Sequence, residues 1–485
     1  MNKKILAAVV CAATVLSLAG CGEKNTSSGN GGGTSNGGTS NGGASNGGTS
    51  APANESVANP DELTDEDDTL SILAWSSNED VQLLIDFYCK ETGTDKSKIN
   101  WVKVGNKGEE SREQYQNYIK GDNDADLIFC DADWAVLYAE MDVTVPLSTI
   151  GITKDQYPDA YAYTLAVGTN SKGEFTGATW QATPGCFVYN AKKAEELLGV
   201  KSPAEMQEKV KDWDTFKATG KEVYEKSGGK TVLQCTEGGL WQVRQAALSK
   251  PWVVDGKFSM DSVADSFYDM AKEYTDEHIL NPNNDQWSTA WYNSINDGSA
   301  IGDFVPTWGL KGASGSIIYN FAAGGTEDSD GNFVANSSAA NDLLAACEGP
   351  QGWFWGGTYM MPTSKINTKK TAADFIKFFT QNADAMKKYA TENGDFMNNS
   401  KAMTGVAFNN PVLIGGQNQF EILLEKAKEI DLDGKVSQYD SQIKSSFNDS
   451  VQKYIKNTAG YGSKDEAIVA CKKDIAEKIS AITVE

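Results

Sequence analysis

The sequence has only two arginines, Arg112 and Arg244, and one histidine, His278. Arginine supplies the planar fork that binds phosphate and carboxylate groups, so its scarcity favours a neutral ligand over an anionic one. With one histidine and no C-x-x-C pair, the chain has almost no ligands for a zinc or haem site. We therefore expect no metal and no cofactor.

Positive charge is also in short supply. The chain has 43 Lys and Arg against 66 Asp and Glu, a formal net charge of −23. Loss of an N-terminal leader with Lys3 and Lys4 would bring the charge to about −25. Such a chain repels nucleic acid phosphates and offers no basic stripe to bind them, so nucleic acid is excluded as a partner.

Long apolar runs are missing except at the N-terminus. The run ILAAVVCAATVLSLAG follows Lys3 and Lys4, and its roughly 16 residues are fewer than the ~20 that span a bilayer. Residues 1–20 are therefore predicted to be an export signal. The run ends in LAGC, which resembles the lipobox of bacterial lipoproteins and implies a lipid on Cys21. Two or more acyl chains there would anchor the protein to the outer face of the cell membrane.

Six cysteines follow Cys21, an even number in an exported chain, so disulfides are possible. They are widely spaced and lie in apolar stretches such as LIFC and FYCK, and a large domain does not need cross-links. We favour buried free thiols. The six are Cys89, Cys130, Cys186, Cys235, Cys347 and Cys471.

Residues 25–60 are rich in Gly, Ser, Thr and Asn and contain the repeat TSNGGTSNGGASNGG. This composition cannot form a core and behaves as a flexible coil, with a reach on the order of 30 to 36 Å. The acidic DELTDEDD ends the stretch. We therefore predict a tether over residues 21–68, with the lipidated Cys21 at its start.

From Thr69 the pattern alternates between strand and helix. TLSILAW, KINWVKVG and ADLIFCDA read as strands, and NEDVQLLIDFYCKETG and SREQYQNYIKG as helices. Asn78 would cap the first helix and Gly93 would stop it. This alternation predicts an α/β fold with a parallel sheet and helices on both faces. Later, EFTGATW, CFVYN and TVLQC read as strands, residues 191–228 as helices, and WVVDGKF as a hairpin turning at Asp255 and Gly256.

The order of motifs resembles the extracellular solute-binding proteins of ABC importers, in particular the maltose-binding-like, carbohydrate-binding group. The matching stretches are ADLIFCDADWAVLYAEMDVTVPLS, TWQATPGCFVYNAKKAEELLG, DWDTFKATGKE and WGGTYMMPTSKINTKKTAADFIKFF. The resemblance implies a two-lobed periplasmic-binding-protein-like fold, in which discontinuous lobes close around a ligand cleft by hinge bending. The ligand would be a neutral oligosaccharide and the partners the ABC permease subunits, with the protein itself a monomer.

The resemblance also implies where the chain crosses between lobes. The crossings would lie near Trp180 to Pro184, near Gly349 to Gly352 and near Ser400 to Thr404. The predicted N-lobe comprises residues 69–182 and 352–402, and the C-lobe comprises residues 183–351 and 403–485.

A sugar ring has an apolar face, which an indole can cover, and a rim of hydroxyls, which carboxylates and amides can bind. The chain has 12 tryptophans, and several follow strands, at the edge where open α/β sheets bind ligands. Trp75 and Glu79 follow the first strand and are candidates, although core packing is the usual fate of a tryptophan. Asp131 is a further candidate, with Asp133 expected to cap the helix at Trp134.

Further candidates come from the crossings and from the second lobe. Trp180 and Gln181 lie on the first crossing. Trp241 and Arg244 share a helix face and could stack together, although a packed amphipathic helix explains them equally well. The strand SAIGDFVP contains Asp303 and precedes Trp308, at a position where the family commonly has a stacking aromatic residue. We assign three other tryptophans to packing, Trp101, Trp134 and Trp213.

The segment QGWFWGG places Trp353 and Trp355 inside a glycine frame. In an extended chain both would lie on one face while Phe354 points to the other. Glycines leave room for a ligand or a second backbone, which suits a crossing strand at the floor of a cleft. We predict that one of the two tryptophans stacks on sugar. The alternative is that both pack between the lobes.

Three other interpretations are weaker. TEDSDGNF partly matches a calcium loop, but Ser337 stands where the closing Glu is needed, so a turn between strands is favoured. A surface glycoside hydrolase would need two carboxylates about 5 to 9.5 Å apart, which a sequence cannot reveal. The pattern G-x-S-x-G occurs only inside the Gly-, Ser-, Thr- and Asn-rich repeat, not between a strand and a helix, and there is no P-loop, so no motif supports an enzyme. An adhesive surface protein would be more repetitive and richer in strands.

Overall fold

The computed structural model describes residues 57–75, 79–105, 114–118, 121, 125–336 and 338–485. The predicted leader, Cys21, most of the tether, Asn78 and Arg112 lie outside these ranges. No helix within them is long and apolar enough to cross a membrane. Residues 57–68, the last part of the predicted tether, lie against the protein: Asp65 accepts hydrogen bonds from the backbone N–H groups of Lys370 and Thr371.

The first sheet has five strands in the order β2-β1-β3-β13-β4. Their bounds are β1 (Leu70–Trp75), β2 (Ile99–Val104), β3 (Leu127–Asp131), β4 (Ala178–Thr179) and β13 (Thr358–Pro362). The parallel pairing predicted for the first three strands is confirmed. The sheet as a whole is mixed, because β13 returns from far along the chain and runs antiparallel to both β3 and β4. The strand predicted at EFTGATW shortens to β4, since Thr176 and Gly177 hydrogen bond to Gly168 instead of the sheet.

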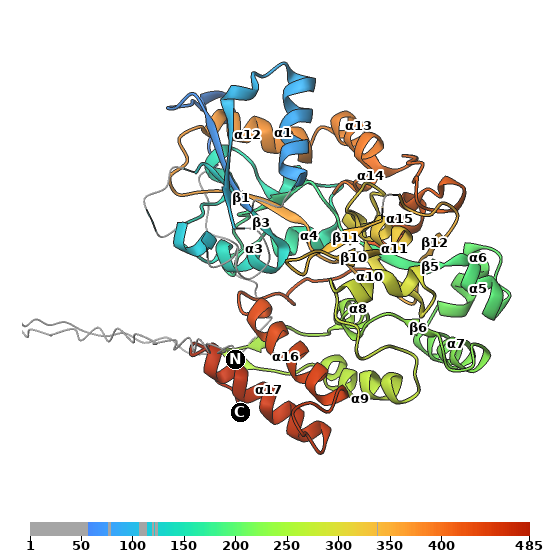
Figure 1. Cartoon of the computed structure of the whole chain (residues 1–485). Helices are drawn as coiled ribbons and strands as arrows, with labels where there is room; N and C mark the ends of the chain where they lie inside the picture. Colours follow the sequence, from blue (N-terminus) through green and yellow to red (C-terminus); the bar gives the residue numbers. More distant parts are fainter. Residues whose placement is uncertain (1–56, 76–78, 106–113, 119–120, 122–124, 337) are drawn as a thin grey trace, which may run out of the picture. The chain divides into compact units, whose positions relative to one another are not determined.

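Strand β1 is buried on both faces, which is why it is apolar almost throughout. Ile72 and Leu73 point to opposite faces and join different hydrophobic clusters. Helix α1 (Glu79–Thr92) covers one face and packs on α12 (Lys369–Thr380), with the rings of Tyr88 and Phe375 4.9 Å apart (Figure 1). The helix stops at Gly93 as predicted: φ there is +75°, and Gly93 N–H bonds to the Cys89 carbonyl at 3.0 Å.

The second sheet has four strands in the order β12-β5-β9-β6. Strand β5 is antiparallel to both of its neighbours, and β6 is parallel to β9. The bounds are β5 (Gly185–Asn190), β6 (Val232–Gln234), β9 (Ala300–Pro306) and β12 (Leu344–Cys347). The predicted strands CFVYN and TVLQC are therefore confirmed.

Two small hairpins lie outside these sheets. The first joins β7 (Val253–Val254) to β8 (Lys257–Phe258) through Asp255 and Gly256, both with positive φ, as the Asp-Gly pair predicts. The second joins β10 (Gly325–Glu327) to β11 (Phe333–Ala335). It contains the calcium-like sequence, where Asp328 accepts hydrogen bonds from the N–H groups of Asp330 and Asn332, so the expected turn between strands is confirmed.

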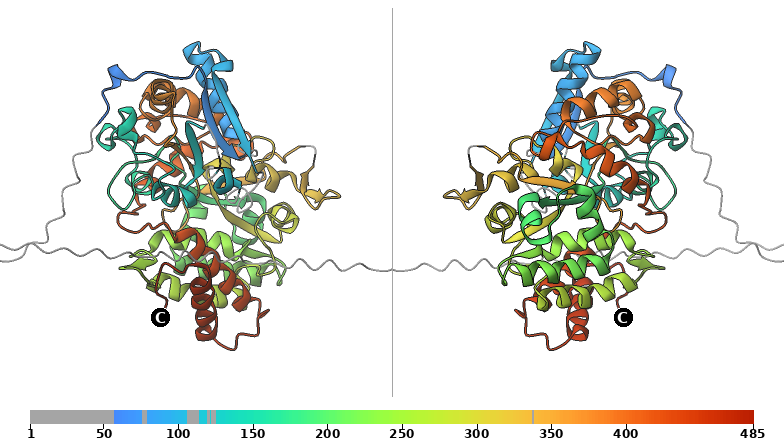
Figure 2. Two further views of the ribbon diagram at one scale, coloured as in Figure 1. Left: turned by 90° about the vertical axis from the view of Figure 1, so that its left-hand side faces the viewer. Right: turned by 90° about the vertical axis from the view of Figure 1, so that its right-hand side faces the viewer.

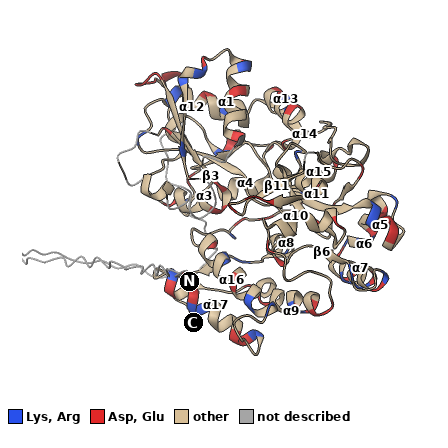
Figure 3. Cartoon of the chain, viewed as in Figure 1, with Lys and Arg blue, Asp and Glu red and all other residues tan. Residues whose placement is uncertain are grey.

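Helices surround both sheets. Helices α9, α16 and α17 lie side by side (Figures 1 and 2), and basic and acidic residues are interspersed along the described helices (Figure 3). The remaining bounds are α3 (Ala132–Ala139), α4 (Ala162–Val167), α5 (Ala191–Leu198), α6 (Pro203–Val210), α7 (Trp213–Lys226), α8 (Glu237–Arg244), α9 (Ser262–Asp276), α10 (Thr289–Asn296), α11 (Ile317–Ala323), α13 (Ala383–Asn393), α14 (Ser400–Met403), α15 (Gln419–Lys428), α16 (Asp440–Ile455) and α17 (Lys464–Lys478).

The six cysteines after Cys21 are free thiols, as expected. Five are buried, and Cys89 is half-buried. Burial is the main cause that raises the pKa of the Cys186 thiol well above its usual range, which keeps it protonated and unreactive.

Asp126, just before β3, links β1 to the segment between β13 and α12. One carboxylate oxygen accepts the Ser71 N–H at 2.8 Å, and the other accepts those of Asn367 and Thr368 at 2.8 and 3.1 Å. We predict that Asp126→Ala lowers the free energy of unfolding by about 3 kcal/mol, because it leaves three N–H groups without an acceptor. Urea unfolding measures this loss. Asp61→Ala, at an exposed position, is the control, and equal stability of the two variants would contradict the prediction.

Candidate functional site

Three tryptophans from distant parts of the chain form a tryptophan wall: Trp287, Trp308 and Trp355. Trp287 precedes α10, Trp308 lies in the short helix η6 (Thr307–Leu310), and Trp355 lies between β12 and β13. The rings of Trp287 and Trp308 are nearly parallel, 6.0 Å apart with 13° between their planes. Trp355 is tilted against both, at 5.7 and 5.3 Å. Trp308 and Trp355 are half-buried and Trp287 is 49% exposed, so part of this aromatic surface is open.

Trp287 was not among the sequence candidates. It ends the polar loop NPNNDQW, and a tryptophan in such a loop is the signal that would have found it. Its φ is +72°, a region that bulky residues avoid and that costs on the order of 1 to 3 kcal/mol. The surrounding structure must hold it there, and Trp291 packs against it edge to face at 5.2 Å.

Asp303 supports the wall from behind. It is fully buried, and its carboxylate accepts hydrogen bonds from Trp291 Nε1 at 2.6 Å and from the backbone N–H of Phe304 at 2.8 Å. Gln234 Nε2 donates a third at 2.5 Å. Burial raises the pKa of Asp303 to about 6. The structure therefore places this predicted ligand residue inside the protein, where it fixes Trp291.

Asp131 meets the wall at Gly356. A methyl group added at Gly356 would lie 3.3 Å from Trp308 Nε1 and 3.4 Å from Asp131 Oδ2, so both atoms lie beside this residue, and its φ of +72° favours glycine. Trp308 Nε1 donates to the Trp355 carbonyl at 2.9 Å. Asp131 thus lies next to the wall, at the carboxyl end of β3.

The assignment of the helix cap needs correction. Asp131, not Asp133, caps α3, because its Oδ1 accepts the Asp133 N–H at 2.9 Å. Asp133 lies in the first turn, and Lys444 of α16 reaches it at 3.3 Å. Burial, with a smaller contribution from Asp133, raises the pKa of Asp131 to about 7. Its second oxygen remains directed toward Gly356.

A second aromatic group lies at the end of β1. Trp75 is half-buried and contacts Tyr115 and Trp134 at ring distances of 6.4 and 6.3 Å. Tyr115 is held by a hydrogen bond to the Phe129 carbonyl at 2.9 Å. Trp134 is buried, as its packing assignment predicts. Glu79 begins α1, but its side chain lies outside the described part of the chain.

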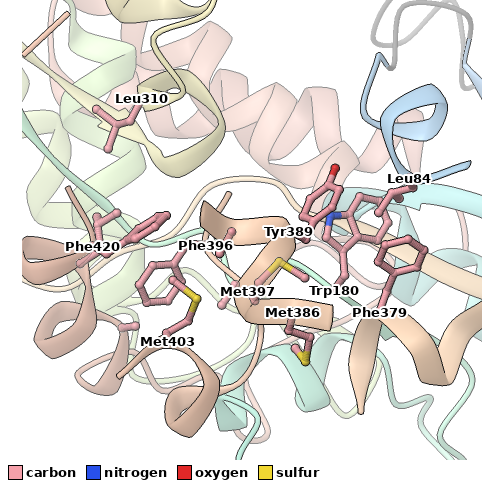
Figure 4. Packing of buried hydrophobic residues seen from close by; sticks show 14 of the residues in the cluster. Leu84, Trp180, Leu310, Phe379, Met386, Tyr389, Phe396, Met397, Met403 and Phe420 are labelled. Atoms are coloured by element: carbon pink, nitrogen blue, oxygen red, sulfur yellow. The ribbon is translucent and has the colours of Figure 1, made fainter. Parts of the chain in front are cut away.

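Trp180 and Gln181 are both buried. Trp180 lies among Leu84, Phe379 and Tyr389, as Figure 4 shows. Its Nε1 donates to Asp395 at 3.3 Å, and Gln181 Nε2 donates to the same oxygen at 3.0 Å. Both side chains are therefore committed to packing and to this buried carboxylate.

Asp395 belongs to an ionic cluster that joins the start of α1 and the segment after α13 to the segment after η6. Lys311 follows η6 and lies 2.5 Å from Asp80 of α1 and 3.6 Å from Asp395. Gln181 bridges the two carboxylates. Although burial lowers the pKa of Lys311, the two carboxylates outweigh it and raise the pKa above its usual value. The cluster therefore keeps Lys311 charged.

Trp241 and Arg244 do not form the pair that their spacing allowed. Trp241 is buried between Phe447 and Phe267, with ring distances of 4.4 and 4.8 Å. Arg244 lies over the ring of Trp213 instead, 5.2 Å from its centroid. The packed amphipathic helix is thus the arrangement that the structure adopts.

Trp353 and Trp355 point to the same face, and Phe354 to the other, as the extended pattern predicts. Trp353 is fully buried, and its ring occupies the space that a side chain at position 185 would need. Gly185 is therefore required for Trp353 to pack. Of the two tryptophans, only Trp355 reaches the wall.

The described residues contain no group of three or more His, Cys, Asp or Glu side chains that could hold a metal ion. What the site offers is flat apolar surface next to a carboxyl group, a combination that suits a ligand with an apolar face and a hydroxyl edge.

Comparison with known proteins gives the following. The family model of bacterial extracellular solute-binding proteins matches residues 84–413. No curated protein sequence matches the chain. Among solved structures, an extracellular solute-binding protein of family 1 has a TM-score of 0.69 at 16% identity, over 84% of this chain and 99% of its own.

Two further similar structures are of sugar-binding proteins. One is the ABC transporter associated binding protein of B. animalis subsp. lactis in complex with β-1,6-galactobiose: TM-score 0.63, 17% identity, 85% of this chain and 97% of its own. The other is the sugar-binding protein MalE of Xanthomonas citri, with a TM-score of 0.62 at 13% identity, over 84% of this chain and 98% of its own. The predicted two-lobed, periplasmic-binding-protein-like α/β fold is confirmed by this likeness.

The raised pKa of Asp131 makes stability depend on pH. The folded state keeps the proton up to about pH 7, whereas the unfolded chain loses it near pH 4, so wild-type stability falls between these values. Asp131→Asn keeps a good helix cap and removes the titration. We predict that, as the pH rises from 4 to 7.5, the free energy of unfolding of the variant increases by about 1 kcal/mol relative to that of wild type. This figure is reduced because the side chain is partly exposed to solvent. Urea unfolding at several pH values tests this, and a difference that does not change with pH would contradict it.

Proposed function

Because the chain belongs to the bacterial extracellular solute-binding protein family, we propose that it captures a neutral oligosaccharide outside the cell. It delivers the sugar, chemically unchanged, to the permease of an ABC importer. The observation that carries this proposal is the tryptophan wall, with Asp131 beside it at Gly356. The sugar-binding relatives described above support a saccharide as the ligand.

The chemistry of the wall suits a sugar ring. Trp287, Trp308 and Trp355 offer indole faces that can cover the C–H groups of a pyranose, and the Asp131 carboxyl can bind a hydroxyl group. With a pKa of about 7, Asp131 can either donate or accept that hydrogen bond near neutral pH. Trp75, at the end of β1, is a further contact on the side of the first sheet.

The charges around the site favour a neutral ligand. Lys311, three residues after Trp308, and Lys444, which pairs with Asp133 in the first turn of α3, both already face carboxylates. Lys444 keeps its charge because Asp133 and Asp440 outweigh the effect of burial and raise its pKa. A phosphorylated or acidic sugar would have to compete with these partners, at a cost in affinity.

We further propose that each sheet is the centre of one lobe. The N-lobe comprises residues 69–182 and 352–402, and the C-lobe residues 183–351 and 403–485. The pairing of β13 with β3 supports the return of the chain to the N-lobe. The ion pairs Asp80–Lys311 and Asp133–Lys444 then join the lobes, and a ligand that contacts both adds to their closure.

Trp308→Ala and Trp355→Ala test the sugar site. We predict that each raises the dissociation constant of the bound oligosaccharide at least about tenfold, because each removes an indole face worth about 1.4 kcal/mol or more. Titration calorimetry against a panel of plant and starch oligosaccharides gives the measurement.

The control is Trp101→Ala, which makes the same change at a half-buried tryptophan on β2, away from the wall. Undiminished affinity in both wall variants would rule out the wall as the site. Product analysis in the same samples separates capture from catalysis, because cleaved sugar would favour a surface glycoside hydrolase. Heat with a peptide or a metal but with no sugar would remove the sugar assignment.

We propose that residues 1–20 are a signal peptide and that lipid on Cys21 anchors the protein to the membrane. Cys21→Ala should move the protein from the detergent phase to the aqueous phase in a phase-partition assay, because one thiol holds all acyl chains. Cys11→Ala is the matched control, since Cys11 would leave with the signal peptide. Wild-type protein found in the aqueous phase would refute the anchor.

A further inference from the structure

A small cavity of about 30 Å³ lies at the start of α8, next to the segment that carries Trp287. Its volume is enough for one or two water molecules. Its lining includes Glu237, Gly238, Asp285, Gln286, Gln452 and Lys456. These residues come from three places: the first turn of α8, the loop before α10 and the end of α16.

Glu237 is the unusual member of this lining. It is only 4% exposed, and neither carboxyl oxygen makes a hydrogen bond of good geometry within the described structure. The Gln452 amide lies near enough to favour the ionised form in part. Burying a carboxylate without strong partners costs free energy, so burial favours the neutral, protonated form of Glu237.

The charged groups near Glu237 come from the loop before α10, from α16 and from β9. Asp285 and Lys456 form an ion pair at 2.6 Å across the cavity lining. Asp303 lies behind the neighbouring Gly239. An ionised Glu237 would therefore face one lysine that is already paired and would compete with Asp285 for it.

The cavity is connected to the tryptophan wall through its loop. Gln286 lies against Gly238, where an added methyl group would be 2.8 Å from its Oε1. Trp287 is the next residue and has the strained positive φ described above. The Asp285–Lys456 pair and the packing of Gln286 on Gly238 therefore anchor the two residues that precede Trp287. The ring of Trp287 itself packs on Trp291, Trp308 and Trp355.

We propose that Glu237 is a protonation switch for the tryptophan wall. In its neutral form Lys456 stays paired with Asp285, and Trp287 stays stacked on Trp308. When Glu237 releases its proton to solvent, the new carboxylate draws Lys456 away from Asp285, and the loop relaxes from its strained backbone. The effect on ligand rests on the sugar-binding function proposed above, but the movement of Trp287 does not.

The pH range of the switch follows from the pKa of Glu237, which burial raises to about 8. Gln452 and Lys456 lower this pKa in part, and Asp285 raises it slightly. The wall is therefore intact at neutral pH and loosens in the alkaline range. A proton, rather than a metal ion, is the occupant of choice, because Lys456 lines the cavity and disfavours a second cation.

Tryptophan fluorescence of the ligand-free, full-length protein tests the switch. The signal assigned to Trp287, taken as wild type minus Trp287→Phe, should change between pH 7 and pH 9 with a midpoint near 8. Glu237→Gln keeps the shape of the side chain and cannot ionise, so it should show no such transition. If Glu237→Gln titrates like wild type, or if wild type shows no transition, the proposal is overturned.

Two further measurements complete the test. The melting temperature of Glu237→Gln relative to wild type should rise from pH 5 to pH 9, since the wild-type folded state loses stability as pH passes from the unfolded pKa near 4.3 toward the folded one. A fluorescence midpoint that shifts with sodium concentration would identify a cation site instead and overturn the proton assignment.

For any oligosaccharide that binds, the dissociation constant of wild type should rise about fivefold from pH 7 to pH 9, against less than about twofold for Glu237→Gln. An equal rise in both proteins counts against the switch. If no sugar binds at all, the proposed function fails, while the ligand-free fluorescence still decides whether Glu237 controls Trp287.

Discussion

The pairing of β13 with β3 is the constraint on which the site depends. It places Thr358 opposite Asp131, and the Ala132 N–H bonds to the Gly357 carbonyl at 2.9 Å. The chain reaches this register directly after leaving β12 in the second sheet. The segment that joins β12 to β13 therefore runs alongside Thr183 and Gly185. The Trp355 N–H donates a hydrogen bond to the Thr183 carbonyl, and the Gly185 N–H donates one to the Trp353 carbonyl. A slip of one residue would reverse its faces and separate Trp355 from the wall.

The tryptophans divide into two kinds because of this arrangement. Trp180, Trp241 and Trp353 fill the interior, where each is enclosed by side chains from several elements. The wall tryptophans and Trp75 follow strands or lie in loops, at positions that packing leaves partly open. Supporting contacts are buried behind them, such as the bond from Trp291 to Asp303. Rigid support of this kind lets an open aromatic surface keep its shape before a ligand arrives.

Several carboxyl groups are buried in this part of the protein, and they differ in the partners that compensate their burial. Asp395 is balanced by Lys311 and by hydrogen bonds, and Asp303 accepts several hydrogen bonds. Glu237 has neither kind of partner at full strength, and burial raises its pKa to about 8, compared with about 6 for Asp303. In an exported, strongly acidic protein, such differences decide which carboxyls respond to the pH outside the cell and which stay fixed.

The sequence by itself determined the local structure and the class of protein. Alternating apolar stretches, Gly93 and the Asp255–Gly256 turn act through their own backbone and near neighbours, so they predicted the strands, the helix end and the hairpin. Motif order likewise led to the family. Only the tertiary structure decided which indoles are enclosed, that Asp131 caps α3, that β13 makes the sheet mixed, and that Trp287 joins the wall. The enclosed indoles, the mixed sheet and the wall depend on residues far apart in the chain, whose contacts no local pattern records. The cap is a local contact, but both Asp131 and Asp133 are suitable caps, so the pattern does not choose between them.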